Sequence, residues 1–296
     1  MFPDFHGRLF VLLAVFLQAV GKVAYGVWLV EVPFTVFVFI SFSMTAGLFL
    51  LLSRQGAGQA AFLPLLMLNL STALTFLSFF YALKLLEPAV VGALEIGVAP
   101  IIALLLTLLL QGERPTAARV MVCLGLLLGC LVLAASAFSG VGFTAGAAVN
   151  GAAWQGVLAS VAAGAGAVVV TMASRKLVQC GWQYGAVLAH RFYLILPVSL
   201  GMALWGGDFS AVEWDMPVLL AVLAVSLLGV TLPLYLLQIG IGRCDTHTVL
   251  VSMAALPVIT FALEMLSPVY AWSWLTAVGV LVVAAFVLLD MLMSRR

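Results

Sequence analysis

Ionisable residues inside long apolar runs are the features of this sequence most able to do chemistry. Lys22 lies in such a run near the N-terminus, and Glu95 lies in another that follows Pro88. A charge within a membrane helix costs at least ~2.5 kcal/mol on insertion scales, so each such residue is a candidate for function. At ~1.5 Å per helical residue, Lys22 and Glu95 have comparable depths. Three interpretations follow: a salt bridge that joins two helices, a substrate or proton site, or no contact.

Polar residues at helical spacing accompany these charges. Gln18, Lys22 and Tyr25 recur at i, i+4 and i+7, and such a stripe on an apolar helix should face protein or water. Two further stripes contain Ser71, Thr75 and Ser78, with Asn69 and Thr72 beside them, and Thr231, Tyr235 and Gln238, with Pro233 beside them. Hydrogen bonding between helices is the default role of such residues in a membrane, and the lining of a cavity fits the same spacing.

Three more ionisable residues lie within or near the apolar runs. His190 is expected near the start of a helix, where it can carry a coupling proton or hydrogen-bond a neighbour. Arg191 is expected to extend its side chain back to the headgroups. Glu264 lies close to two tryptophans, which predicts an interfacial carboxylate.

The candidate set for substrate binding or coupling combines these charges with nearby polar and aromatic residues. It consists of Gln18, Lys22, Tyr25, Asn69, Thr72, Tyr81, Glu95, His190, Tyr193, Tyr235 and Gln238. Pro100 and Pro257 are hinge candidates, because a proline inside a helix frees a backbone carbonyl and permits a bend.

The motifs of other function classes do not occur. The cysteines Cys123, Cys130, Cys180 and Cys244 have no C-x-x-C spacing, so neither a metal site nor a disulfide framework is expected. The sequence has no H-E-x-x-H, no glycine-rich phosphate loop and no basic block. We therefore expect no metal, no cofactor, no nucleic-acid partner and no enzymatic activity. An intramembrane lipid-acting enzyme and a passive channel remain lower alternatives.

The elements that must position these residues are membrane helices. Of 296 residues, 65% are hydrophobic and 8% are charged, against roughly a quarter charged in an ordinary soluble domain. Apolar runs long enough to cross the ~30 Å hydrocarbon core recur along the chain. They predict an all-α polytopic protein with ten transmembrane helices near 8–29, 34–52, 62–83, 89–110, 117–137, 154–174, 184–206, 217–238, 247–266 and 273–292.

The loops between these helices indicate an orientation. With the N-terminus inside, nine lysines and arginines fall on the cytoplasmic side and only Lys84 falls outside, as the positive-inside rule requires. Both termini are then cytoplasmic, and the expected location is the plasma (inner) membrane.

A weakly hydrophobic, glycine-rich break divides the chain into two halves. Residues 138–153 separate a first five-helix repeat, 1–137, from a second, 154–296. Because five is odd, the second repeat enters the membrane inverted, and inverted repeats around a central cavity are a recurrent plan of secondary transporters. Gly125 and Gly129 form a G-x-x-x-G pattern that fits close helix packing or a dimer face, so a monomer and a homodimer both remain open.

Essentially the whole chain resembles the EamA-type family of the drug/metabolite transporter superfamily, with the signature in residues 81–133. The resemblance rests on a YALK turn, an apolar helix with a central proline, and a G-E-R turn before a glycine-containing helix, here Tyr81–Lys84, Pro100, Gly112–Arg114 and Gly125. The second half departs from the pattern, because SPVYAWSW from Ser267 replaces the repeated G-E turn. The resemblance implies a basket of helices with alternating access and an exporter of amino acids, other metabolites or toxic compounds.

The residues and the resemblance together predict the substrate class. Opposite charges at one depth suit a zwitterion such as an amino acid, whose carboxylate would meet Lys22 and whose ammonium would meet Glu95. The aromatic rings of Tyr25, Tyr81, Tyr193 and Tyr235 equally suit an organic cation or drug. The expected partners are a small-molecule substrate, the lipid bilayer and protons as a candidate coupling ion.

Overall fold

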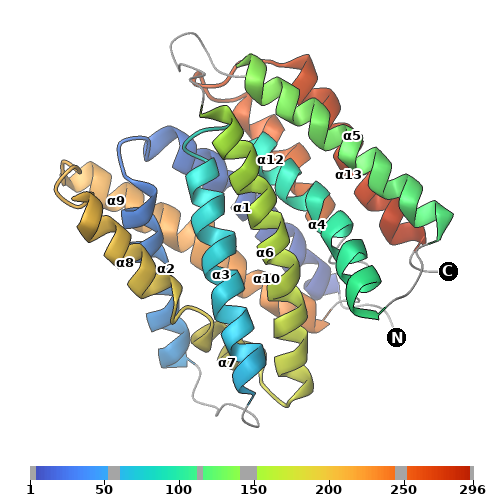
Figure 1. Ribbon diagram of the computed structural model, residues 1–296. Coiled ribbons are helices and arrows are strands. Elements are labelled where there is room, and N and C mark those ends of the chain that lie inside the picture. The colour runs from blue at the N-terminus through green and yellow to red at the C-terminus, as the bar shows by residue number, and fades with distance from the viewer. Residues whose placement is uncertain (1–4, 53–60, 112–115, 141–151, 244–251, 294–296) are drawn as a thin grey trace.

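The computed structural model describes residues 5–52, 61–111, 116–140, 152–243 and 252–293 (Figure 1). Within these ranges the chain folds into helices and forms no β-strand. The predicted G-E-R turn, most of the predicted 138–153 linker, Cys244 and the start of the predicted helix 247–266 lie outside the described residues.

The first half of the chain forms five continuous helices. These are α1 (Phe5–Trp28), α2 (Phe34–Leu52), α3 (Phe62–Ala82), α4 (Pro88–Gln111) and α5 (Ala117–Ser139). Each agrees with its predicted range to within a few residues. Pro88 is the first residue of α4, a position at which proline loses no helical hydrogen bond.

The second half contains shorter helical segments. It comprises α6 (Ala153–Gln179), α7 (Tyr184–His190), α8 (Ile195–Gly206), α9 (Met216–Ala224), the π-helix η1 (Val225–Thr231), α10 (Leu232–Arg243), α12 (Leu256–Glu264) and α13 (Trp274–Met293). The end predicted at 174 for α6 is wrong, because this helix continues to Gln179.

Eight helical stretches of the described residues are long and apolar enough to span a membrane, and they correspond to the first eight predicted helices. Two shorter apolar helices, Ser252–Glu264 and Trp274–Asp290, occupy the ninth and tenth predicted positions. The polytopic all-α class is therefore confirmed, while the count of ten spans stays a prediction.

The predicted helix 184–206 is interrupted. Helix α7 ends at His190 and α8 begins at Ile195. Pro197 lacks the N–H that would bond to the carbonyl of Tyr193, which removes a helical hydrogen bond at this point. The amide of Asn69 in α3 supplies replacements: its Nδ2 donates to the His190 carbonyl at 3.0 Å, and its Oδ1 accepts from Leu194 N–H at 3.4 Å.

The predicted helix 217–238 is also modified. A π-helical segment, Val225–Thr231, separates α9 from α10, which runs on to Arg243. Pro233 lies two residues after this segment and cannot donate to the Gly229 carbonyl, which is consistent with a local change of helical pitch. Gly229 faces Gly21 of α1 so closely that a Cβ added at Gly229 would lie 2.7 Å from the Gly21 Cα.

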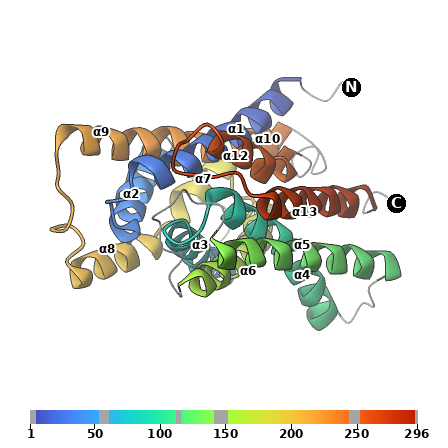
Figure 2. The same ribbon diagram turned by 90° about the horizontal axis from the view of Figure 1, so that it is seen from above.

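The helices pack as pairs drawn from the two halves of the chain. Helix α3 lies along α6, and α1 lies along η1 and α10. Helices α5 and α13 lie side by side at one end of the molecule, and α8 and α9 lie at the opposite end (Figure 2). The face of α5 that carries Gly129 packs on α13, since a Cβ at Gly129 would lie 2.8 Å from the Val283 side chain.

Candidate functional site

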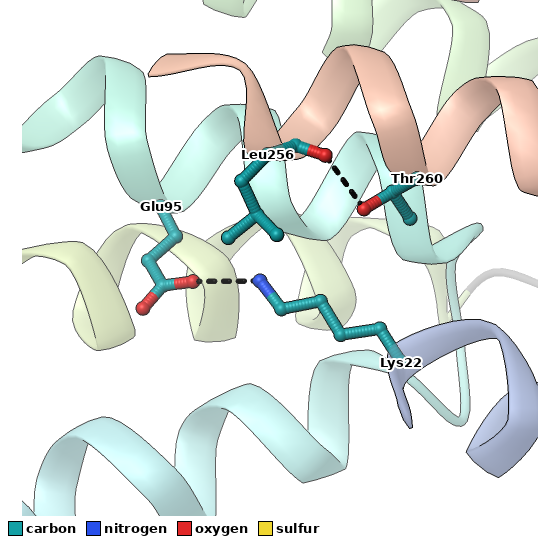
Figure 3. Close-up of polar contacts among 4 residues, drawn as sticks. All are labelled: Lys22, Glu95, Leu256 and Thr260. Atoms are coloured by element: carbon teal, nitrogen blue, oxygen red, sulfur yellow. Dashed lines mark hydrogen bonds and ion pairs between the residues drawn. The ribbon is translucent and has the colours of Figure 1, made fainter. Parts of the chain in front are cut away.

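Lys22 of α1 and Glu95 of α4 form an ion pair. The Lys22 Nζ and Glu95 Oε2 atoms are 3.5 Å apart, and the two side chains are 10% and 19% exposed. Lys22 precedes Trp28 by six residues and Glu95 follows Pro88 by seven, which places both ~10 Å along their helices. Figure 3 shows the two side chains pointing toward each other. The predicted contact is confirmed, and the interpretation without a contact is wrong.

Small and aromatic residues make room for the Lys22 ammonium. The ring centroid of Phe79 in α3 lies 4.4 Å from Nζ, a geometry that favours a cation. A Cβ at Gly92, one turn before Glu95 on α4, would lie 3.3 Å from Nζ. A Cβ at Gly164 of α6 would lie 2.6 Å from the Glu95 carbonyl oxygen. The site therefore depends on the missing side chains at Gly92 and Gly164.

Helix α12 lies beside the ion pair, a contribution that sequence reasoning missed (Figure 3). Leu256 and Thr260 are buried, and the Thr260 hydroxyl donates to the Leu256 carbonyl at 2.8 Å. Pro257 is the second residue of α12 and follows a turn at Ala255 within the apolar stretch Ser252–Glu264, and its part as a hinge stays a prediction. Pro100 lies inside α4, as expected.

Tyr25 lies on the face of α1 that was predicted to point inward. Its side chain is 1% exposed, and its ring packs against Phe37 and Phe80 with centroid separations of 4.6 and 5.2 Å. Its hydroxyl is buried and has no hydrogen-bond partner in the described part of the chain. Gln18, one turn before Lys22, is half-buried. The predicted inward face of α1 is confirmed, and Tyr25 retains a free hydroxyl within it.

Asn69 and Thr72 of α3 are buried. Asn69 bonds to the backbone at the α7–α8 break, so the expected role in interhelical hydrogen bonding is confirmed for it. The Thr72 hydroxyl is buried and has no hydrogen-bond partner in the described part of the chain.

His190 and Arg191 occupy the α7–α8 break rather than the start of a helix. His190 Nδ1 shares a hydrogen bond with the hydroxyl of Tyr193, which is 52% exposed. Arg191 is 5% exposed, and its guanidinium lies 5.7 Å from the ring of Phe76 and 5.5 Å from that of Phe192. The expectation that Arg191 reaches the headgroups is therefore wrong, because aromatic rings hold its side chain inside the protein.

Tyr81 and Tyr235 contact residues other than the ion pair. The Tyr81 hydroxyl donates to Gln155 Oε1 of α6 at 2.6 Å. Tyr235 is 44% exposed and stacks near Phe49, with centroids 5.9 Å apart. The Gln238 side chain lies outside the described side chains. No recorded contact of Tyr81 or Tyr235 involves Lys22 or Glu95 within the described ranges.

A second polar cluster lies where α4 begins and α12 ends. Glu264 is fully buried, and its Oε1 accepts from Ala89 N–H at 2.6 Å. Glu87 is 3% exposed, and its Oε2 accepts from the Thr276 hydroxyl at 3.2 Å. Glu264 is thus buried inside the protein at the start of α4, and its depth near the membrane interface stays a prediction. Sequence reasoning did not select Glu87, although an acidic residue directly before Pro88 at a helix start was an available signal.

Two ionisable groups just outside the spanning segments have shifted pKa values. Burial raises the pKa of Glu87 to about 7, and the hydrogen bond from Thr276 opposes the rise. Burial lowers the pKa of Lys84 to about 8, against the attraction of Glu31. The Lys84 ammonium donates to the carbonyls of Leu29 and Val30 at 2.6 Å each.

These features define a polytopic helical membrane protein with an ion pair between its helices. Residues 6–135 match the EamA-like transporter family. The family recognised from the sequence is thereby confirmed over this part of the chain.

Comparison of structures supports the fold over almost the whole length. A crystal structure of a protein aligns with 98% of this chain and 98% of its own, with a TM-score of 0.63 and 21% sequence identity. At that identity the likeness shows a shared fold. A search of curated protein sequences finds no match.

Proposed function

We propose that this protein is a secondary transporter that exports small organic metabolites by alternating access, with Lys22 and Glu95 at its substrate site. The observation that carries the proposal is the contact between these two charges, 3.5 Å apart within two membrane helices. Charges at this depth are costly, and uncharged residues could join the helices at lower cost. The match of residues 6–135 to a transporter family supports the same function.

The preferred substrates are amino acids or related amphipathic solutes. In the empty carrier the ammonium and the carboxylate neutralise each other. A zwitterion that separates them replaces each contact with one of opposite charge, since its carboxylate meets Lys22 and its ammonium meets Glu95. The charge balance of the site is then the same before and after binding.

An organic cation or drug is the alternative substrate. The ring of Phe79 already lies 4.4 Å from the Lys22 ammonium, and the same ring face would attract a bound cation. Such a substrate would compete with Lys22 for Glu95 and would leave the site with an extra positive charge.

The packing of the helices supports an inverted-repeat architecture of ten spans, residues 1–137 and 154–296. A symmetry operation that exchanges the two halves requires the third helix of each half to pack on the first helix of the other. Helix α3 lies along α6, and η1 with α10 lies along α1, as this symmetry requires. Contacts of α2 with α8, α4 with α12 and α5 with α13 join equivalent helices. The lysine and arginine distribution supports a plasma (inner) membrane protein with cytoplasmic termini.

Counterflow in proteoliposomes tests the proposal. Labelled amino acids, sugars and organic cations are offered to vesicles preloaded with the unlabelled solute, with wild type compared with Lys22→Ala and Glu95→Gln. Lys176→Ala is the matched control, because Lys176 is exposed at the end of α6. We expect saturable exchange of one zwitterion class, lost in both site variants and kept in the control. Exchange of no solute by folded wild-type protein would refute the transporter function.

A further inference from the structure

The cluster at the start of α4 and the end of α12 contains two buried carboxyl groups that share no cation. Glu87 and Glu264 are 3% and 0% exposed, and neither forms an ion pair with a described residue. Lys84, three residues before Glu87, directs its ammonium to the carbonyls of Leu29 and Val30. Two adjacent carboxylates without a counter-charge cannot both remain ionised at low cost.

One oxygen of this cluster is available for a ligand. Glu264 Oε2 is buried and has no hydrogen-bond partner in the described part of the chain. Its other oxygen, Oε1, accepts from the Ala89 N–H, one of the amides at the start of α4 that have no partner within the helix. A helix N-terminus favours a nearby negative charge. The geometry therefore favours one shared proton and one remaining negative charge on the pair.

The other groups around the pair are hydroxyls. Thr276 of α13 donates to Glu87, and Ser136 of α5 bonds to Thr276 at 2.7 Å. Tyr270, the third titratable group here, has its pKa raised by burial and by both carboxylates. Its hydroxyl approaches Gly26 of α1 so closely that a Cβ at this position would overlap it. No basic side chain from α1, α4, α5, α12 or α13 contacts either carboxyl group in the described residues.

We propose that Glu87 and Glu264 form a proton-binding site that couples solute export to a pH gradient. This inference rests on the proposed transport function and names its coupling ion. Glu264 of α12 joins this helix to α4 through the Ala89 amide, and α4 carries Glu95 while α12 lies beside the ion pair. Glu87 directly precedes α4 and is eight residues from Glu95, ~12 Å at the helical rise.

The coupling follows from electrostatics. With one proton bound, the pair carries a single negative charge that the start of α4 stabilises, and α4 and α12 stay in contact. Loss of the proton leaves two buried negative charges, and their repulsion favours separation of α4 from α12 and entry of water. Binding of a proton from one side of the membrane therefore favours one conformation of the carrier. Release of the proton to the other side favours the conformation that opens to the opposite face.

Two transport assays separate this inference from the function on which it rests. Counterflow without a pH gradient reports the carrier, and accumulation under an imposed gradient reports coupling. We expect Glu87→Gln and Glu264→Gln each to reduce gradient-driven accumulation at least tenfold. The counterflow of each variant should stay within twofold of wild type. Glu213→Gln, on the exposed α8–α9 loop, is the control that keeps both activities.

Each possible outcome tests either the proton site or the transporter function. Wild type that shows counterflow without any gain from a gradient overturns the proton site and leaves the transporter standing. Variants that keep full gradient-driven accumulation overturn the site as well. Absence of all counterflow in the wild type refutes the transporter itself.

A chemical measurement on the wild type does not depend on variants that fold. Dicyclohexylcarbodiimide reacts with protonated carboxyl groups in apolar surroundings, and mass spectrometry locates the label. We expect labelling at Glu87 that falls severalfold between about pH 6 and about pH 8, as a carboxyl group that titrates near neutrality requires. Labelling that is absent throughout this range, or unchanged by pH, would overturn the proposal.

Discussion

At the scale of single residues, the contact between Lys22 and Glu95 was predictable because charges are rare in this chain. Two ionisable side chains at similar depth in apolar helices have few partners apart from each other. Glu264 shows the limit of this reasoning. Its short distance along the chain from Trp272 and Trp274 suggested the membrane interface, but its burial involves the start of α4, which the local sequence does not reveal.

A charge exchange tests the ion pair directly. Lys22→Glu or Glu95→Lys alone places two like charges within the membrane, and breaking a buried pair costs about 3–5 kcal/mol. We expect each single variant to lose thermal stability and counterflow, and the double variant Lys22→Glu with Glu95→Lys to recover stability. Melting in detergent, followed by fluorescence-detected size-exclusion chromatography, measures the recovery. A double variant no more stable than the singles would argue against a direct interaction.

The shifted pKa of Glu87 predicts a pH-dependent stability. Because burial raises this pKa from 4.5 to about 7, the folded protein holds a proton between these values that the unfolded chain has released. The free energy of unfolding that this bound proton contributes is present in full below pH 4.5 and is lost as the pH rises to 7. Its size is on the order of 3 kcal/mol. We expect Glu87→Gln to remove this part of the decline in melting temperature between about pH 5 and about pH 7.5, with Glu213→Gln retaining it.

At the scale of helices, hydropathy located the spans but not their interruptions. A window of apolar residues reports affinity for lipid and is insensitive to the path of the backbone. The α7–α8 break depends on Asn69, which lies 121 residues before His190 in the sequence. Likewise, the close approach at η1 depends on Gly21 in α1. Pro197 and Pro233 were visible signals, yet a proline alone does not determine whether a helix bends, breaks or widens.

Substitution of Asn69 tests the account of the α7–α8 break. Asn69→Ala removes two hydrogen bonds and leaves the part-buried His190 carbonyl and Leu194 amide without these partners, at a cost of about 1–3 kcal/mol. We expect a lower melting temperature and faster hydrogen exchange at residues 190–195. Asn69→Asp keeps the acceptor for Leu194 but places a buried carboxylate beside the His190 carbonyl, so it should be no more stable than the alanine variant. Exchange at the break that equals that of wild type would show that Asn69 does not hold it.

At the scale of the whole molecule, the Lys22–Glu95 ion pair lies between helices of the interior, and the apolar helices α5 and α13 lie at one end. Composition predicted a polytopic membrane protein, and the recognised family predicted a basket-like fold. The pairing of α3 with α6 and of α1 with α10 was not predictable, because helices that face lipid and helices that face protein have similar hydropathy. The polar side chains that distinguish the two faces are few in this chain.

Apart from the hydroxyls of Ser136 and Thr276 at the proton site, the position of α5 and α13 predicts that they support the fold without taking part in solute exchange. Gly129→Val would place methyl groups against Val283, where the added Cβ would already lie 2.8 Å away. Such overpacking costs about 1–3 kcal/mol. We expect a lower melting temperature with counterflow unchanged per folded molecule. A folded variant that has lost exchange would instead assign these helices a part in the transport cycle.

The α7–α8 break and the π-helical segment both lie in the second half of the chain, whereas the helices of the first half are continuous. The two halves are therefore expected to differ in stiffness, because interrupted helices bend more easily than continuous ones. On the proposed function, a solute bound between Lys22 and Glu95 is expected to deform the second half of the chain more than the first. The two halves would then move unequally during transport.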